Sequence, residues 1–496
     1  MLTALIATLS ALLVVPGGPR DFWTVDVEGM PNAERALLQS VQGIANRQGP
    51  LVWQRVGGMA EKMTDEMKAE GWTEQRTKDV WQVVAAFRPQ LKGAVLCDVR
   101  DESLNRAATD SGLKDLLVVD ASLEAKAKAE GFSVVEDART EARVLPGADP
   151  ELSKLIAVEQ PPDKAGFLRD YAIKHRALCF LASDSRERRH VLGRLSPGAW
   201  VLGWGSDEYR WVSDISWVGG IGCAADWCAN LSAMESLGGA IRSPRAPEQE
   251  PDPKPGERVV AFVLTDGDNV QWLTGGMPLH EHFYGSPLRG TFKMTWEVSP
   301  MLARFAPRVL DYMYGAAGPK DGFVAAGAPG YSYMDLAPDR KVAAKQTGPL
   351  LRASGLHVVG VINSQEGELA EAEEILDLPE VEGVVYKDYA PYHGKHGAVW
   401  WHKGKPCVGY RFSLWDQMAG ASPDEVAAAI AKLPADPTHD TSSYALVTVH
   451  AWSYGSIDGP LEAVRQTITK LPPGTRVVTA PELVGWMKRF CAPRAP

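Results

Sequence analysis

The feature that most constrains the fold is a series of short apolar runs in the second half of the chain. Segments with the apolar and charged spacing of helices lie between the runs. Near-continuous apolar strands that alternate with helices predict an α/β protein, and a segment of this length predicts a (β/α) barrel or a distorted barrel. The eight runs that we expect to be strands are 259–265, 291–297, 322–328, 357–363, 381–387, 407–413, 444–450 and 476–480.

A stretch rich in proline and charge divides the chain near its middle. Residues 242–257, RSPRAPEQEPDPKPGE, have no apolar period and are typical of an inter-domain linker. Upstream, residues 21–241 alternate short apolar runs with charged helical segments, which predicts a smaller α/β region of one or two lobes, divided near Asp110. Downstream, residues 258–491 make up the predicted barrel domain.

The first twenty residues form a separate segment. Their apolar core is too short to cross a bilayer and is typical of a signal peptide, although no basic residue precedes it, so an N-terminal anchor remains an alternative. Both interpretations predict a secreted or periplasmic protein. Of the six cysteines, Cys223 and Cys228 are close enough in sequence to suggest a local disulfide.

Charge and aromatic content restrict the partners. A formal net charge of -10 leaves no basic stripe, which argues against nucleic acid or an anionic membrane as the main partner. The 16 tryptophans lie largely near Gly, Asp or Tyr, and flat rings in such places suit the faces of sugars. We therefore expect a carbohydrate substrate, with no membrane contact beyond the possible anchor.

Polar side chains gather where the apolar runs end, which is where a (β/α) barrel builds its active site. Each has a structural alternative: the aspartates would also suit a helix cap, the tyrosines a packed loop, and Lys387 with Asp388 a salt bridge at the rim. The candidate catalytic residues are Asp266, Asp268, Glu297 and Asp388. The candidate substrate-binding residues are Asn269, Trp272, Tyr331, Tyr333, Asp335, Glu366, Arg411, His450 and Trp452.

Several motifs are shared with a known family. They read GAPGYSYMDL, LTDGDNVQW and WEVSP in the second half, and QGIANRQGPLVW, LGWGSDEY and CANLS in the first. With these motifs the chain resembles the GxGYxYP family, to which glycoside hydrolase activity is attributed. Ala328 and Met334 stand where the family name has its first glycine and its proline, and alanine lacks the access of glycine to positive φ. The resemblance implies an exported, sugar-directed protein with a small α/β N-terminal region and a barrel-like C-terminal domain. It assigns no catalytic roles.

Glycoside hydrolysis is the leading functional hypothesis. The reaction needs one protonated carboxyl group, which assists departure of the leaving oxygen, and one ionised carboxylate. Asp266 or Asp268 and Glu297 end neighbouring predicted strands, so they are the expected pair, and no cofactor or metal is required.

Two alternatives belong to other classes. LTDGDN resembles the TFDDG segment of metal-dependent polysaccharide deacetylases, in which Asp268 and His450 would hold the metal, but WEVSP stands where that family has paired histidines. The other alternative is a non-catalytic carbohydrate-binding protein, which the altered GxGYxYP loop would suit.

Overall fold

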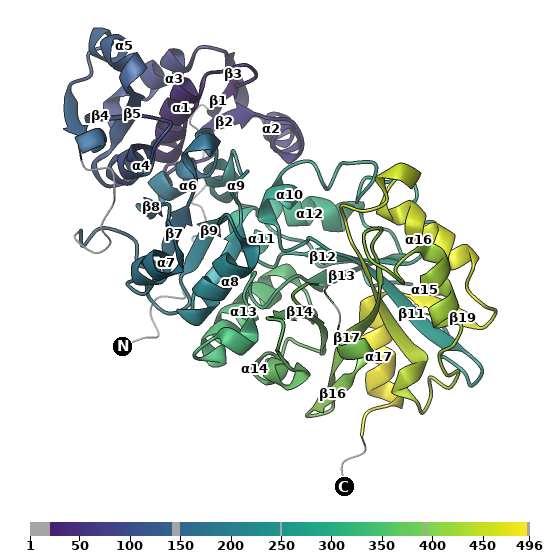
Figure 1. Cartoon of the computed structure of the whole chain (residues 1–496). Helices are drawn as coiled ribbons and strands as arrows, with labels where there is room; N and C mark the ends of the chain where they lie inside the picture. The colour runs from purple at the N-terminus through teal and green to yellow at the C-terminus, as the bar shows by residue number, and fades with distance from the viewer. Residues whose placement is uncertain (1–19, 141–148, 249, 391, 393, 494–496) are drawn as a thin grey trace.

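A computed structural model describes residues 20–140, 149–248, 250–390, 392 and 394–493 (Figure 1). The predicted signal segment therefore lies outside the described residues, except for Arg20. No helix in the described part of the chain is long and apolar enough to span a membrane.

The second half of the chain is a closed parallel barrel (Figure 1). Seven strands follow one another around it, and the barrel closes because β12 pairs with β11 at Val263 and Leu264. The strands are β11 (Arg258–Leu264), β12 (Met294–Val298), β13 (Asp321–Ala325), β14 (Val358–Asn363), β15 (Gly383–Asp388), β17 (Lys405–Leu414) and β18 (Tyr444–Val449).

The eighth predicted run distorts this barrel. It forms β19 (Thr475–Val478), which pairs with the first part of β11, from Arg258 to Ala261. The end of β11, at Val263 and Leu264, pairs with β12 instead. All eight predicted runs are thus strands, and the (β/α) barrel prediction is confirmed in its distorted form. A ninth strand, β16 (Val399–His402), pairs antiparallel with β17.

The helices of this half follow the strands. They are α10 (Val270–Thr274), α11 (Leu302–Phe305), α12 (Pro307–Ala316), α13 (Arg340–Ser354), α14 (Glu373–Leu376), α15 (Pro423–Ile430), α16 (Pro460–Thr469) and α17 (Ala480–Phe490). Capping boxes begin α15, with Ser422 and Glu425, and α17, with Thr479 and Glu482.

Helix α17 closes the amino end of the barrel. Its residues Leu483, Val484 and Met487 are buried in one cluster with residues of seven strands, among them Val259 and Val358. The amide of Ala480 donates to the hydroxyl of Thr295, near the start of β12, at 2.8 Å. The lower barrel is therefore a packed apolar core, and any open site must lie at the opposite, carboxyl end.

The N-terminal region contains three small parallel sheets. The first, in the order β2-β1-β3, consists of β1 (Asp21–Asp26), β2 (Val52–Arg55) and β3 (Thr73–Thr77), with α1 (Asn32–Ala45), α2 (Met59–Ala69) and α3 (Val80–Ala86). The second, β5-β4-β6, consists of β4 (Gly93–Cys97), β5 (Leu116–Asp120) and β6 (Val134–Asp137), with α4 (Ser103–Lys114) and α5 (Glu124–Ala129).

The third sheet, β10-β9-β7-β8, makes backbone bridges to loops at the mouth of the barrel. It consists of β7 (Ile156–Glu159), β8 (Leu178–Phe180), β9 (Trp200–Gly203) and β10 (Ile221–Ala224), with α6 (Arg169–Lys174), α7 (Ser185–Leu192), α8 (Glu208–Trp217) and α9 (Leu231–Leu237). We call this part, residues 150–238, the third unit.

Two sequence expectations differ from the observed N-terminal region. Asp110, where a division was expected, lies inside α4, so the boundaries between the sheets fall elsewhere. Cys223 and Cys228 are buried free thiols, so the prediction of a local disulfide is wrong. The described residues of 242–257 form neither helix nor strand, and Glu250 and Asp252 pair with Lys293 and Arg489 of the barrel domain.

Candidate active site

A buried ion pair lies at the top of the barrel interior. Lys387, from the end of β15, places its Nζ 3.1 and 3.2 Å from the two carboxylate oxygens of Glu297 on β12. The hydroxyl of Tyr410, on β17, donates to Glu297 Oε1 at 3.3 Å. Three strands thus hold one carboxylate in place, through a charge-assisted pair with the lysine and a hydrogen bond from the tyrosine.

The loop after β11 brings a second carboxylate to the same place. Asp266 has a φ of 67°, a left-handed conformation that aspartate tolerates better than most residues. Gly267 lies so close to β12 that a Cβ on it would be 1.9 Å from the carbonyl oxygen of Glu297, so no side chain fits there. This tight turn places Asp268 close enough to Glu297 and Lys387 for their charges to act on it. The side-chain amide of Asn269 donates to Asp268 Oδ1 at 3.3 Å.

The acid–base properties of these groups differ. Burial raises the pKa of Asp268 to about 7; Lys387 opposes this shift, and the charges of Asp266, Glu297 and Glu208 add to it. Burial also disfavours the charged form of Lys387, but the carboxylates of Glu297 and Asp268 outweigh it and raise the pKa of that ammonium. A lysine held protonated is a poor nucleophile, which argues against imine chemistry at Lys387. The site therefore places the Lys387-bound carboxylate of Glu297 near an Asp268 that can hold a proton at neutral pH.

A third carboxylate comes from the N-terminal region. Glu208 is the first residue of α8, and its Oε1 accepts hydrogen bonds from the hydroxyl of Tyr331 and, at 3.3 Å, from that of Tyr392. Burial raises the pKa of Glu208, the two hydroxyls lower it, and Asp266 raises it further. Sequence reasoning missed this residue, although it lies within the LGWGSDEY motif.

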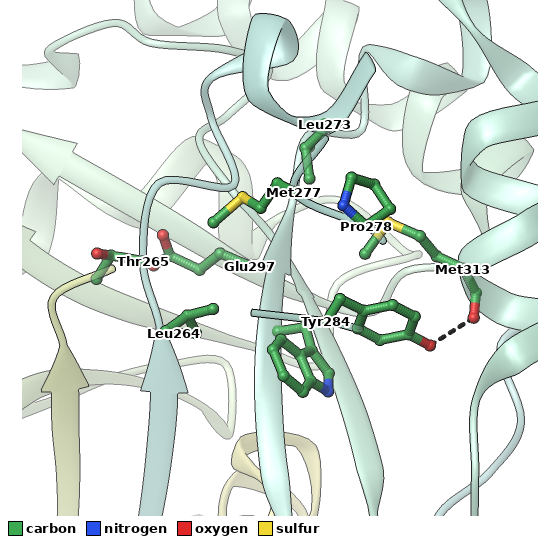
Figure 2. A pocket seen from close by; sticks show the side chains of 9 residues that line it. Leu264, Thr265, Leu273, Met277, Pro278, Tyr284, Glu297 and Met313 are labelled. Carbon is green, nitrogen blue, oxygen red and sulfur yellow. Dashed lines mark hydrogen bonds between the residues drawn. The ribbon is translucent and has the colours of Figure 1, made fainter. Parts of the chain in front are cut away.

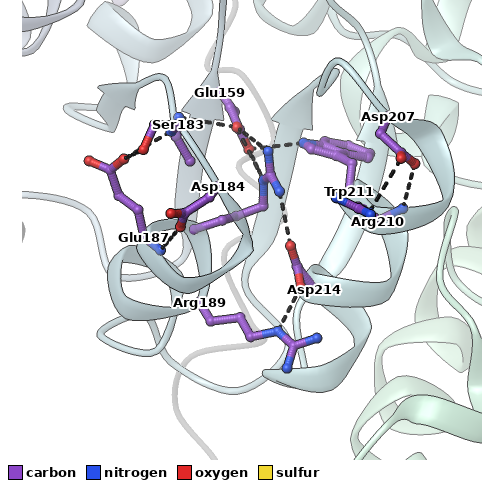
Figure 3. A network of polar contacts seen from close by, with 11 residues as sticks. Glu159, Ser183, Asp184, Glu187, Arg189, Asp207, Arg210, Trp211 and Asp214 are labelled. Atoms are coloured by element: carbon purple, nitrogen blue, oxygen red, sulfur yellow. Dashed lines mark hydrogen bonds and ion pairs between the residues drawn. The ribbon is translucent and has the colours of Figure 1, made fainter.

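A buried ionic network holds α8 in position (Figure 3). The guanidinium of Arg188, on α7, pairs with Glu159 of β7 at 2.8 Å and with Asp214 of α8 at 2.9 Å. The indole of Trp211, also on α8, donates to Glu159 Oε2 at 3.0 Å. A strand and two helices are thereby tied together, and Glu208 is carried by the helix that they fix.

The loop that contains Tyr331 and Tyr333 packs against the third unit. The amide of Tyr331 donates to the carbonyl of Gly222 on β10 at 2.9 Å, and the amide of Tyr333 to the hydroxyl of Ser216 at 2.9 Å. The positive φ of this loop, 78°, falls on Gly327 rather than on Ala328. Alanine at the altered motif position is therefore compatible with the loop.

Aromatic residues form one side of the barrel mouth. Trp452 is 48% exposed, and its ring packs edge-on against Trp272 at 5.2 Å and Phe283 at 5.1 Å. His450 stacks on Trp415 at 4.0 Å, and its Nδ1 lies 2.8 Å from the hydroxyl of Ser453. Burial lowers the pKa of His450 against the opposing effect of Asp266, which favours the neutral imidazole.

Four predicted site residues have other contacts. Asp388 faces away from Lys387, since side chains alternate along β15, and accepts from the hydroxyl of Tyr386 at 2.7 Å. Asp335 binds the amide of Ser364 at 2.9 Å and so ties its loop to the end of β14. Arg411 donates to the carbonyl oxygens of His396 and Ser442. Glu366 is exposed on a loop. None of the four contacts the Glu297 carboxylate in the described part of the chain.

A small cavity lies behind Glu297 (Figure 2). Its volume is about 10 Å³, room for about one water molecule, and Met277, Tyr284 and Trp296 are among its lining residues. It is too small for a sugar, so a substrate would have to approach Glu297 from the barrel mouth.

The residues do not fit the metal site of a deacetylase. The described residues contain no group of three histidine, cysteine, aspartate or glutamate side chains arranged to hold a metal ion. His450 is also engaged through Nδ1 by Ser453 and by its stacking on Trp415. The pair of Asp268 and His450, which the deacetylase alternative would use, therefore has no third ligand of these types among the described residues.

Comparisons with known proteins identify the family. Residues 257–488 match the model described as "GxGYxYP putative glycoside hydrolase C-terminal domain", residues 153–236 the "GxGYxYP third domain", and residues 91–149 the "GxGYxYP_N second domain". The chain belongs to the GxGYxYP family. A comparison with curated protein sequences gave no match.

A solved structure shares the whole fold. The crystal structure of a "putative hydrolase" from Bacteroides thetaiotaomicron VPI-5482 superposes with a TM-score of 0.86. It is 22% identical in sequence, and the match covers 96% of each chain. The likeness therefore extends over the N-terminal sheets as well as the barrel.

Proposed function

We propose that the protein is a glycoside hydrolase that acts on a poly- or oligosaccharide by carboxylate acid–base catalysis. The observation that carries this proposal is the pair at the barrel mouth: Glu297 held by Lys387 and Tyr410, beside Asp268, whose pKa is raised to about 7. Two neighbouring carboxyl groups with different protonation states are what glycosidic cleavage requires. The family to which the chain belongs supports the same reaction class.

The roles follow from the environments of the two groups. Protonated Asp268 gives its proton to the glycosidic oxygen as the bond to the anomeric carbon breaks. Ionised Glu297 either attacks that carbon, with retention of configuration, or takes a proton from an attacking water, with inversion. Lys387 holds the Glu297 carboxylate in place through its two contacts. Asn269, beside Asp268, is placed to orient that carboxyl group.

Hydrolysis of a glycan panel tests this proposal. Purified mature protein is incubated with polysaccharides and acetylated glycans, with and without EDTA, as wild type and as Glu297→Gln. We expect the wild type to release reducing ends even when EDTA is present, and the Glu297→Gln variant to release none. Release of acetate that EDTA abolishes would instead support the deacetylase alternative, and binding without any cleavage would support a carbohydrate-binding protein.

We also propose that the protein acts outside the cytoplasm. The apolar core at residues 2–15 supports export, and a substrate of polymeric glycan agrees with that location. Amino-terminal sequencing of the secreted or periplasmic protein tests this. A mature chain that still begins at Met1 and remains in the cytoplasm would contradict it.

A further inference from the structure

A group of side chains between the third unit and the barrel is not used by the two catalytic carboxyl groups. Tyr392 links its members, because its hydroxyl donates to Glu208 at 3.3 Å and its ring stacks on Trp415 at 5.6 Å. The ring of Tyr389 packs against Tyr392 at 5.6 Å and against Tyr333 at 5.8 Å. Glu208, Tyr389, Tyr392 and Trp415 all keep part of their surface exposed, so the group is accessible.

One polar atom here has no hydrogen-bond partner in the described part of the chain: the indole nitrogen of Trp415. The hydroxyl of Tyr333, whose side chain has 0% exposure, neighbours the hydroxyl of Tyr331. Burial and then the charge of Glu208 raise the pKa of Tyr333, so this hydroxyl lies near that carboxylate. A buried donor without a partner is costly, and a ligand oxygen that accepts from it would offset the cost.

The charge around this group is negative. Asp207 and Asp266 act on Glu208, and Asp266, Glu297 and Glu208 act on Asp268. Among the described residues, the cation that acts on Asp268 is Lys387. Because Lys387 is already paired with Glu297, an anionic ligand would meet repulsion without compensation. A sugar with hydroxyl or ammonium groups would instead donate to Glu208 and lie against the tyrosine and tryptophan rings.

We propose that Glu208, Tyr333, Tyr389, Tyr392 and Trp415 form a sugar-binding subsite that selects neutral or amino-bearing sugars and rejects acidic ones. The proposal rests on the proposed glycoside hydrolase function and adds the substrate class. It also makes the third unit a component of the site, since Glu208 comes from α8. The barrel alone would lack the carboxylate that receives the sugar hydroxyls.

Binding can be measured without turnover. We would titrate Glu297→Gln protein by calorimetry with neutral gluco-, manno- and galacto-oligosaccharides, a deacetylated chito-oligosaccharide and an oligogalacturonate. Neutral or amino-bearing glycans should bind and the oligogalacturonate should not. Adding Glu208→Gln should weaken binding about tenfold or more, since a charged hydrogen-bond acceptor is lost, and adding Tyr392→Phe should weaken it less.

A matched control is Glu382→Gln, an exposed residue near the start of β15 at the opposite end of the barrel, which should leave binding unchanged. The subsite is overturned if Glu208→Gln binds as tightly as its parent, or if the oligogalacturonate binds as well as neutral glycans. Failure of the hydrolase proposal looks different: wild type would bind a glycan and leave it intact. Wild type that binds none of the five ligands would contradict both proposals.

Discussion

The two ends of the barrel are built from the same strands but have opposite character. At the amino end, α17 closes the interior with Leu483, Val484 and Met487, and side chains there are apolar and buried. At the carboxyl end, the next inward positions carry Glu297, Lys387 and Tyr410, which pair with one another. The difference indicates that the closed end stabilises the fold. The buried charges at the open end contribute little to stability, so they are better explained by function.

The two ends also differ in their dependence on the rest of the chain. The closed end is completed by α17, which belongs to the barrel domain itself. The open end receives Glu208 from the third unit, and backbone bridges join Gly222 to Tyr331 and Ala224 to Asn269. The N-terminal region should therefore matter for ligand binding more than for the barrel core.

The largest expected effect is at the open end. Glu297→Gln should lower kcat roughly 10²- to 10⁴-fold, because the glutamine amide can neither form the glycosyl bond nor take a proton from water. Its melting temperature should fall, because Lys387 is left buried without its carboxylate partner, but the variant should stay folded at assay temperature. Steady-state kinetics measures kcat and thermal unfolding measures the melting temperature, with Glu382→Gln as the control. If the Glu297→Gln variant unfolds at assay temperature, Glu297 has a structural role instead of a catalytic one.

The network behind Glu208 should give the next effect. Arg188→Met leaves Glu159 buried without its cation, while Asp214 keeps its pair with Arg189. The loss should cost about 3 to 5 kcal/mol of unfolding free energy. Exposed Arg186→Met, on the same helix, should change it little. Urea unfolding measures both variants. Equal stabilities would mean that the network does not hold α8.

The closed end should show the reverse of the Glu297 result. Leu483→Ala removes a fully buried side chain and should destabilise the protein by about 2 to 5 kcal/mol. At temperatures where it stays folded, kcat should equal that of wild type. A loss of kcat in the folded variant would show that the two ends are coupled, contrary to the comparison.

The pH dependence concerns Asp268. Its pKa is raised to about 7, so the protonated form that donates to the leaving oxygen is present below this pH. The value of kcat/KM should fall as pH rises through about 7. The free energy of unfolding should fall in the same direction. A pKa that is raised in the folded state adds stability, which is fully present below the usual aspartate pKa and is lost as pH rises through about 7. Asp268→Asn should remove both dependences.

The smallest effect is expected at the aromatic side of the mouth. Trp452→Ala should raise KM a few-fold with little change in kcat, because ring stacking on a sugar contributes about 0.5 to 1.5 kcal/mol. Steady-state kinetics would show this. A drop in kcat alone would place Trp452 in the chemistry instead.

Much of the barrel could be predicted because its strands are long apolar runs with clear ends. The eight runs gave eight strands, and the polar residues after them marked the open end. Because these runs are apolar on both faces, they do not show which side chains face the barrel interior. Lys387 and Asp388 are adjacent, yet Lys387 reaches Glu297 and Asp388 binds Tyr386, and a strand that is apolar on both faces does not reveal this alternation.

Residues that come together across domains were the harder part. Glu208 is far in sequence from Tyr331, and its motif carries no spacing that signals a barrel mouth. Arg411 lies where β17 shifts register between Tyr410 and Phe412, and such an irregularity depends on the neighbouring strand. Local patterns determine strands and turns, whereas these placements depend on how separate elements pack.

The central claim is that Asp268 supplies the proton and Glu297 the ionised carboxylate. The most direct test compares the cleaved glycan with a dinitrophenyl glycoside of the same sugar, whose leaving group needs no proton. We predict that Asp268→Asn loses activity on the glycan but keeps it on the dinitrophenyl glycoside, and that Glu297→Gln loses both. Equal losses on the two substrates for Asp268→Asn would contradict the account.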